Sequence, residues 1–304
     1  MRKIYQLLFL LFLALSMAAG KALALTAADP FPAATSTRAE AIRYIDQITK
    51  LDSSKYWPYI KPDLFLKNLK LNVYEPLSFY PGRSTNFCAF GAASYIFIKE
   101  DPLGYVKFLM TLYNSGVATY GDVSFKPSDG IKNAAGRLRF KGVLDLRHAE
   151  QMWFLVLADR FKGYLNIFNR TYDRGDENRF WAATNYGKFN RMVKKLMGYR
   201  VHAVGSDLLH PWLKDVYSYI DENMKKGIVV LYINNRILHK KNHTSVKLGI
   251  PTHFIVLENI SRIGNLITMQ YWDYGSKTLM QVSPETLRKI TYGISVCTKK
   301  PLHD

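Results

Sequence analysis

The order of residue patterns along the chain is the feature that most limits its fold. Between residues 37 and 226, apolar residues recur mostly at helical spacing, whereas after residue 226 short apolar runs alternate with turn residues. These later runs predict strands over 227–233, 253–260, 266–272 and 294–298. Helices followed by a block of strands are typical of an α+β fold with a largely antiparallel sheet.

The helical positions follow from apolar spacing and from start signals such as Pro102 and the Ser283-Pro284 pair. The predicted helices cover 37–51, 86–98, 101–114, 146–169, 186–197, 211–226 and 284–290. Residues 52–85 are interpreted as a mixed segment with proline turns, and residues 117–142 as loops. The block 143–226 is interpreted as a helical insertion.

The first 24 residues predict export. A basic start, Arg2-Lys3, precedes an apolar run over 7–19, and small residues near 22–24 offer a cleavage site. This is the pattern of a secretory signal peptide, and the run is too short to span a membrane. We therefore expect a protein that is exported, either periplasmic or secreted. Residues 25–85 would then form an N-terminal leader and helical segment.

The charge balance is strongly basic. The formal net charge is +18, and the first 24 residues carry three of these positive charges (Arg2, Lys3, Lys21) and no acid, so removal of the leader leaves +15. Such a charge favours binding to an anionic cell-envelope surface, although it also serves solubility. No zinc-ligand spacing or RNA-binding signature is present, so we expect no nucleic-acid partner.

Three residues in order have the chemistry of a thiol enzyme. Cys88 opens an apolar segment that reads as a helix, His253 heads an apolar strand, and Asp273 ends the next predicted strand. A helix N-terminus stabilises a thiolate, an imidazole can exchange its proton, and a carboxylate orients the imidazole. The Cys88 N–H and the nearby Asn86 amide are the candidate oxyanion donors. This chemistry needs no cofactor and no metal.

Other interpretations of these residues stay open. Cys88 and Cys297 are the two cysteines of an exported chain and can form one disulfide. His239 and His243, four residues apart, can share a helix face and bind a metal, but the surrounding lysines and asparagines favour an exposed loop. The acids within 172–178 match no calcium-loop spacing and are interpreted as a solvated loop.

At these residues the chain resembles the papain-like cysteine peptidase superfamily, most closely the bacterial branch that includes bacteriocin-leader peptidases. The resemblance rests on five segments: 86–94, 227–234, 253–257, Asp273 and 283–290. It implies a papain-like fold over 86–304, with Cys88 as nucleophile, His253 as general base and acid, and Asp273 as the orienting residue. That family often has Gln six residues before the cysteine, where this chain has Gly82.

The resemblance implies an exported thiol hydrolase that cleaves peptide or isopeptide bonds in a peptide, protein or peptidoglycan substrate. A transglutaminase-like acyltransferase uses the same residue types and differs in its acceptor. A third alternative keeps the fold without catalysis, with Cys88 buried or joined to Cys297. The sequence does not fix an oligomeric state.

Overall fold

The computed structural model describes residues 34–82, 84–138, 143–162, 171–179, 181–235 and 251–299. The predicted signal peptide over 1–24, the start of the leader segment, and His239 and His243 lie outside these ranges. Within the described ranges, none of the helices has the length and apolar content needed to cross a bilayer.

The described part of the chain combines nine α-helices with an antiparallel sheet. The helices are α2 (Arg38–Asp46), α3 (Pro62–Tyr74), α4 (Cys88–Glu100), α5 (Pro102–Ser115), α6 (Asp129–Ala134), α7 (His148–Phe161), α8 (Tyr186–Met197), α9 (Val216–Met224) and α11 (Pro284–Ile290). The short 3₁₀ turns are η1 (Pro76–Ser78), η2 (Val143–Leu146) and η3 (Asp176–Asn178). A small hairpin consists of β1 (Ala118–Tyr120) and β2 (Val123–Phe125).

The main sheet has six strands in the order β3-β8-β4-β5-β6-β7, and every neighbouring pair is antiparallel. Its members are β3 (Arg200–Gly205), β4 (Ile228–Ile233), β5 (His253–Ile263), β6 (Leu266–Asp273), β7 (Ser276–Val282) and β8 (Thr291–Thr298). The expectation of helices joined to an antiparallel sheet is therefore confirmed. The two edges of the sheet, β3 and β7, are both strands that the sequence analysis does not predict.

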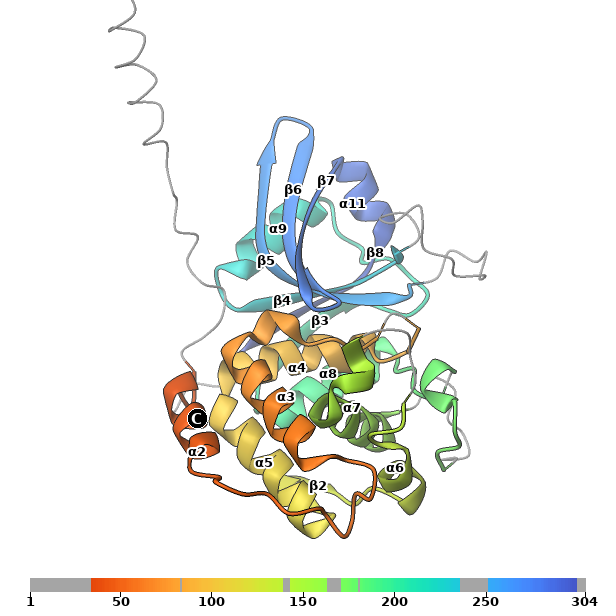
Figure 1. Ribbon diagram of the computed structural model, residues 1–304. Coiled ribbons are helices and arrows are strands. Elements are labelled where there is room, and N and C mark those ends of the chain that lie inside the picture. Colours follow the sequence, from red (N-terminus) through yellow and green to blue (C-terminus); the bar gives the residue numbers. More distant parts are fainter. Residues whose placement is uncertain are drawn as a thin grey trace, which may run out of the picture.

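The sheet separates two apolar cores because its central strands are apolar at successive positions. In β4, Ile228 and Val230 belong to the core shared with α4, α5, α7 and α8, whereas Val229 and Leu231 belong to the core covered by α9 and α11. Figure 1 shows these layers: the larger helical part lies below the sheet, and α9 and α11 lie against its upper side.

Helix α4 lies at the centre of the helical layer. From Ala89 to Ile98 every residue is buried, so the helix is surrounded by protein on all sides. It packs against β5 and against α5, α7 and α8. This packing places its N-terminal residue, Cys88, close to the start of β5.

Several boundaries differ from the sequence-based expectations. Residues 52–85 contain the full helix α3, and 117–142 contain β1, β2 and α6, where the sequence analysis expects turns and loops. The block 143–226 is not purely helical, since it supplies α7 and α8 to the main core and β3 to the sheet. Residues from α2 and α3 also belong to that core, so the segment before Cys88 packs with the rest of the chain.

Candidate active site

Cys88 is the first residue of α4, as the sequence predicts. The preceding residue, Phe87, occupies the N-cap position, and no side chain caps the first turn of this helix. The positive end of the helix dipole and the backbone N–H groups of the first turn therefore lie beside the Cys88 thiol. Cys88 is half-buried.

Gly91 lets α4 come close to the strand that carries Asp273. A methyl group at position 91 would lie 2.9 Å from a ring carbon of Trp272 and 3.0 Å from Pro81, closer than carbon atoms normally approach. Trp272 is fully buried, stacks on Tyr95 of α4 at 5.4 Å between ring centroids, and donates its indole N–H to the Leu77 carbonyl. Trp272 thus fixes the separation between the helix and the end of β6.

His253 and Asp273 meet where two neighbouring strands begin and end. His253 is the first residue of β5 and Asp273 is the last of β6. The His253 Nε2 and the Asp273 Oδ1 lie 2.6 Å apart, the distance of a strong charge-assisted hydrogen bond. Both residues are nearly inaccessible to solvent, at 1% and 5% exposure, so water does not compete with this bond.

The Cys88 thiol lies beside the same histidine. Its S–H donates to the carbonyl of Thr252, the residue before His253, at 3.8 Å. Since Nε2 is bonded to Asp273, Nδ1 is the ring nitrogen left for the thiol, and it has no hydrogen-bond partner within the described part of the chain. The structure therefore brings Cys88, His253 and Asp273 to one place.

The surroundings of His253 favour its charged form. Burial by itself lowers the pKa of this imidazole, but the Asp273 carboxylate and the Cys88 sulfur outweigh burial and raise it to about 10. The imidazole is therefore protonated near neutral pH. A histidine in this state can stabilise a neighbouring thiolate and can later give its proton to a leaving group.

Tyr274 is a residue of this site that the sequence analysis does not assign. Its ring stacks on the His253 imidazole, with centroids 4.5 Å apart and planes 16° apart. Its φ of +43° lies in the left-handed region, the one such value at a non-glycine residue among the described residues. Strained backbone of this kind clusters at functional sites. The Asp273-Tyr274-Gly275 turn was the available signal, but turn chemistry alone does not reveal stacking.

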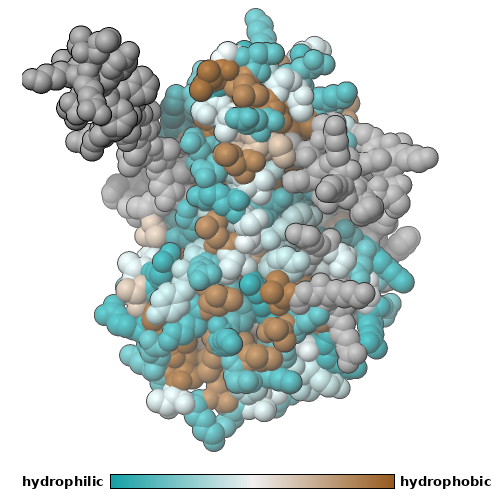
Figure 2. All heavy atoms as spheres, turned by 45° about the horizontal axis from the view of Figure 1, so that its top comes forward, coloured by the Kyte–Doolittle hydropathy of each residue, from teal (hydrophilic) through white to brown (hydrophobic). Residues whose placement is uncertain are grey.

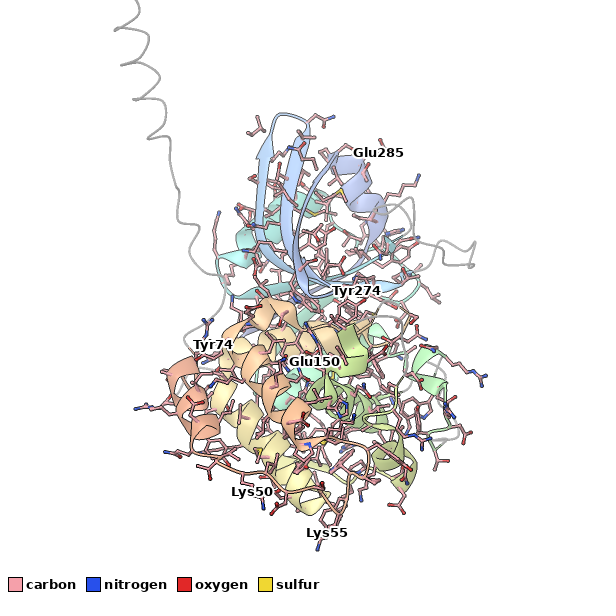
Figure 3. The ribbon with its side chains drawn as sticks, in the orientation of Figure 1. Lys50, Lys55, Tyr74, Glu150, Tyr274 and Glu285 are labelled. Atoms are coloured by element: carbon pink, nitrogen blue, oxygen red, sulfur yellow. The ribbon has the colours of Figure 1, made fainter. Side chains whose placement is uncertain are left out.

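The turn after β6 is supported by the segment 76–82. A side chain at Gly275 would meet the Phe79 carbonyl at 2.9 Å, so the two backbones are in close contact. The segment is in turn held by α7: Arg147 donates to the Ser78 carbonyl, and Glu150 accepts from the Tyr80 N–H at 2.8 Å. Figure 3 shows Tyr274 where the sheet meets the helices and Glu150 in the helical part below it.

Glu150 is a buried acid outside the predicted set. Its carboxylate also accepts from Asn68 at 3.1 Å and pairs with Arg147 at 3.1 Å. Burial raises the pKa of Glu150 to about 7, although Arg147 and the backbone of Tyr80 oppose this rise. One of its hydrogen bonds ends at Tyr80 in the supporting segment, which gives Glu150 a structural position behind the Tyr274 turn.

Asn86, the predicted second oxyanion donor, is used to hold a neighbouring loop. Its amide Nδ2 donates to the Arg179 carbonyl at 2.7 Å, and its backbone N–H donates to the Glu177 carbonyl at 2.9 Å. One amide proton remains after this bond, so the oxyanion role of Asn86 stays a prediction. The loop 171–179 is thereby fixed beside the N-terminus of α4.

The acids of that loop satisfy local groups. Asp176 accepts from the Asp173 N–H at 2.8 Å, and Glu177 accepts from the Tyr172 hydroxyl at 2.6 Å. Both carboxylates are buried, contrary to the expected solvated loop. Within the ranges that the structure describes, no group of three or more His, Cys, Asp or Glu side chains is arranged to hold a metal ion.

The two cysteines are both free thiols, so the disulfide alternative is not supported. Cys297 lies in β8 between β3 and β4, where it is opposite Val201 on one side and Ile228 on the other. It is completely buried, and burial raises its pKa to about 12.

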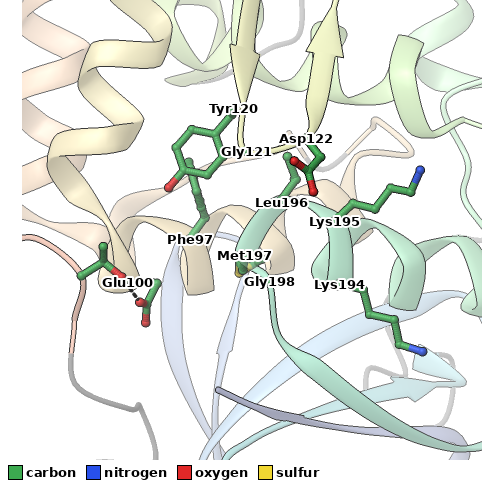
Figure 4. A pocket seen from close by; sticks show the side chains of 11 residues that line it. Phe97, Glu100, Tyr120, Gly121, Asp122, Lys194, Lys195, Leu196, Met197 and Gly198 are labelled. Atoms are coloured by element: carbon green, nitrogen blue, oxygen red, sulfur yellow. Dashed lines mark hydrogen bonds between the residues drawn. The ribbon is translucent and has the colours of Figure 1, made fainter. Parts of the chain in front are cut away.

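A cavity among the described residues is remote from this site. It measures about 520 Å³ and lies at the other end of α4, between Phe97, Glu100, the β1–β2 turn and the last turn of α8 (Figure 4). Glu100 is twelve positions after Cys88 on this helix, which corresponds to roughly 18 Å. This cavity therefore takes no part in the arrangement around Cys88.

A scan against protein-family models and a search of curated proteins found no match to this sequence.

Proposed function

We propose that this protein is an exported, papain-like thiol hydrolase that cleaves peptide or isopeptide bonds. The observation that carries the proposal is the convergence of Cys88 at a helix N-terminus, His253 at a strand start and Asp273 at 2.6 Å from the histidine. These residues come from three elements that are far apart in sequence, and their order along the chain and their roles agree with the resemblance stated above.

The reaction would proceed in two steps, formation and hydrolysis of a thioester. The Cys88 thiolate attacks the substrate carbonyl carbon, the C–N bond breaks, and the amine leaves with the proton of the His253 imidazolium. Water then attacks the thioester carbonyl and gives a proton to His253, and the C–S bond breaks to release the acid and regenerate the thiolate–imidazolium pair. The Cys88 backbone N–H would bind the oxyanion in both steps.

Asp273 and Tyr274 would act on the histidine rather than on the substrate. The carboxylate keeps the ring protonated and directs Nδ1 toward the sulfur, and the tyrosine ring fixes the plane of the imidazole. The substrate class follows from charge and export: a basic protein outside the cytoplasm would meet acidic proteins or peptidoglycan stem peptides.

The proposal is tested by alkylation of the native chain from residue 25 onward. Iodoacetamide labelling, read by mass spectrometry at each cysteine, should be fast at Cys88 near neutral pH and absent at Cys297. In His253→Ala, labelling of Cys88 should slow by about tenfold or more, because the thiolate loses its counter-ion. Slow labelling of Cys88 that does not depend on His253 would overturn the mechanism.

An acyltransferase would use the same three residues, and the acceptor distinguishes the two reactions. A peptide library incubated with a labelled primary amine should give free acids if water resolves the thioester. Labelled amides formed in preference to acids would instead support the transglutaminase-like alternative. Cys88→Ala serves as the blank in both measurements.

A further inference from the structure

The loop 206–213, which joins β3 to α9, presents large apolar side chains to solvent. Leu208 and Leu209 are each 73% exposed, and Trp212 is fully exposed at 101%. The other tryptophans of the chain are all buried: Trp57, Trp153, Trp181 and Trp272. Three such side chains within five residues on the surface indicate a binding surface, because single exposed apolar residues are ordinary but clusters are not.

Hydrogen bonds within the loop and to β8 hold the loop in this exposed conformation. The Ser206 N–H donates to the carbonyls of Tyr292 and Leu209, and the Ser206 hydroxyl accepts from the N–H groups of Leu208 and Leu209. His210 makes a 2.8 Å hydrogen bond through Nδ1 to the Thr291 carbonyl and packs on the Tyr292 ring. These bonds tie the loop to β8 and hold the apolar side chains outward.

Helix α8 lies directly beside the loop. The Asp207 carboxylate accepts from the N–H of Tyr186, the first residue of α8, at 2.9 Å. The Tyr186 hydroxyl donates to the Val204 carbonyl at the end of β3. The loop therefore begins at the N-terminus of α8, and the exposed face of α8 extends away from it.

That exposed face is basic. Helix α8 contains no acidic residue, and its outward positions include Arg191, Lys194 and Lys195. None of these three side chains forms an ion pair within the described part of the chain. Figure 4 shows the Lys194 and Lys195 side chains extending away from the helix. Arg191 is five residues from Tyr186, or roughly 7.5 Å along the axis, so the charges begin close to the apolar loop.

The opposite face of α8 fixes this orientation. Tyr186 and Phe189 join a row of stacked rings with Tyr232 and Phe254, with centroid distances between 4.2 and 5.8 Å. Rotation of the helix would break this row, so the basic side chains stay on the outside.

We infer that the loop 206–213 and the basic face of α8, together called the loop–helix surface, bind an anionic lipid bilayer. Trp212 and the two leucines would enter the headgroup region, where tryptophan is favoured, and the α8 cations would contact lipid phosphates. The formal charge of +15 after removal of residues 1–24 complements such a surface. A purely anionic glycan or phosphate polymer matches the charges but offers no apolar phase for the loop. The inference shares with the proposed function only the export and removal of residues 1–24, and it does not depend on the catalytic proposal.

The test is co-sedimentation of the chain from residue 25 onward with vesicles of phosphatidylcholine alone and of phosphatidylcholine mixed with phosphatidylglycerol. Binding should require phosphatidylglycerol. Arg191→Glu, Lys194→Glu and Lys195→Glu together should weaken it by about a hundredfold, because each cation near an anionic surface adds to the affinity. Leu208→Ser with Trp212→Ser should weaken it by about tenfold or more.

Matched controls distinguish binding by the loop–helix surface from the effects of net charge and of exposed apolar area elsewhere. Lys50→Glu, Lys55→Glu and Lys67→Glu change the net charge equally, and Figure 3 shows Lys50 and Lys55 at the far end of the helical part. Leu279→Ser removes a leucine of similar exposure, 67%, from β7, at the opposite edge of the sheet. Apolar side chains lie at several places on the surface (Figure 2), so this second control is informative. Neither control should change vesicle binding.

Trp212 supplies a direct readout of insertion, because it is the tryptophan that iodide can reach. Quenching of its fluorescence by iodide should fall when vesicles with phosphatidylglycerol are added, and should be absent throughout in Trp212→Ser. Continued quenching of Trp212 on bound vesicles would overturn the inference. So would binding that the α8 variants weaken and the loop variants leave unchanged, since that result indicates an anionic polymer site.

Discussion

The two cysteines occupy regions of opposite character, and the comparison shows how the surroundings decide what a thiol can do. Cys88 lies half-buried at the N-terminus of α4, beside the start of β5 and the charged His253–Asp273 pair. Cys297 lies fully buried in the middle of the sheet, where burial raises its pKa to about 12. Cys88 is partly exposed to solvent and has a cationic imidazole next to it, and Cys297 has neither.

The largest expected effect is the loss of activity when the half-buried thiol of Cys88 is removed. Cys88→Ala should reduce hydrolysis of a peptide library by more than about a thousandfold, because the proposed nucleophile and its covalent intermediate would be lost. Cys297→Ala should retain activity and lose only about 1 kcal/mol of stability, since it leaves a small cavity. Mass spectrometry of the library and thermal unfolding measure the two outcomes, and equal activities in the two variants would remove the functional difference between the cysteines.

The next effect concerns the Asp273 carboxylate, which favours the protonated form of His253. Asp273→Asn should lower the rate of library hydrolysis by about a hundredfold, because the imidazole loses its orientation and its charge partner. It should also move the alkaline limb of the pH–rate profile down by more than about one pH unit, since Asp273 is the main group that raises the pKa of His253.

The His253–Asp273 pair should also make the free energy of unfolding depend on pH. A raised folded-state pKa stabilises the fold fully below the unfolded value of about 6.5, and this stabilisation is lost as the pH rises toward about 10. Denaturant unfolding from pH 6 to pH 10 should therefore show a decline that Asp273→Asn reduces. An alkaline limb of the pH–rate profile at the same pH in wild type and in Asp273→Asn would contradict the role assigned to Asp273.

The sequence predicts the three site residues better than it predicts the edge strands of the sheet and helix α3. Cys88, His253 and Asp273 stand at the ends of strongly apolar segments, which have clear periodicity and clear boundaries. The edge strands β3 and β7 have mostly exposed or half-buried residues and lack such a signal. Helix α3 buries Asn68 and Asn72 in a polar network with Glu150 and Tyr105, so its buried face does not read as apolar.

Contacts between distant segments are the part that no local pattern contains. The support of the Tyr274 turn by residues 76–82 depends on Arg147 and Glu150, which lie about 70 residues further along the chain. The fixing of Asn86 by the loop 171–179 spans an even longer separation. Such pairings follow from the packing of whole elements, and a single sequence records only the residue types that enter them.

A smaller effect should follow from loss of the ring that stacks on His253. Tyr274→Gly removes the ring and also relieves the positive φ, so the fold should be kept or stabilised. Alkylation of Cys88 should nevertheless slow by roughly tenfold, because a stacked ring pair contributes about 0.5–1.5 kcal/mol.

Tyr274→Phe is the matched variant, since it keeps the ring and removes only the hydroxyl. It should label at nearly the wild-type rate, with the alkaline limb unchanged. If Tyr274→Gly and wild type label equally fast, the stacking has no role in positioning the histidine. If Cys88 labels as slowly in Tyr274→Phe as in Tyr274→Gly, the Tyr274 hydroxyl rather than its ring positions the histidine.

The smallest effect tests the distance between α4 and β6, on which the difference between the two thiols depends. In Gly91→Ala the new methyl group would press on Trp272 and Pro81, and one of these elements must shift. Overpacking of this kind costs about 1–3 kcal/mol. Cys88 is three residues before Gly91 on the same side of the helix, so its alkylation should slow several-fold while Cys297 stays unlabelled.

Gly187→Ala is the matched control for helix propensity. Gly187 also lies in the first turn of a helix, but its added methyl group would meet only the Asn185 side chain, at an ordinary 3.7 Å. Alanine favours a helix over glycine by roughly 0.5–1 kcal/mol, so this variant should be more stable than wild type. Denaturant unfolding of both variants measures the contrast. A gain in stability for both would mean that α4 can move away from Trp272 freely, and the fixed position of Cys88 would then need another explanation.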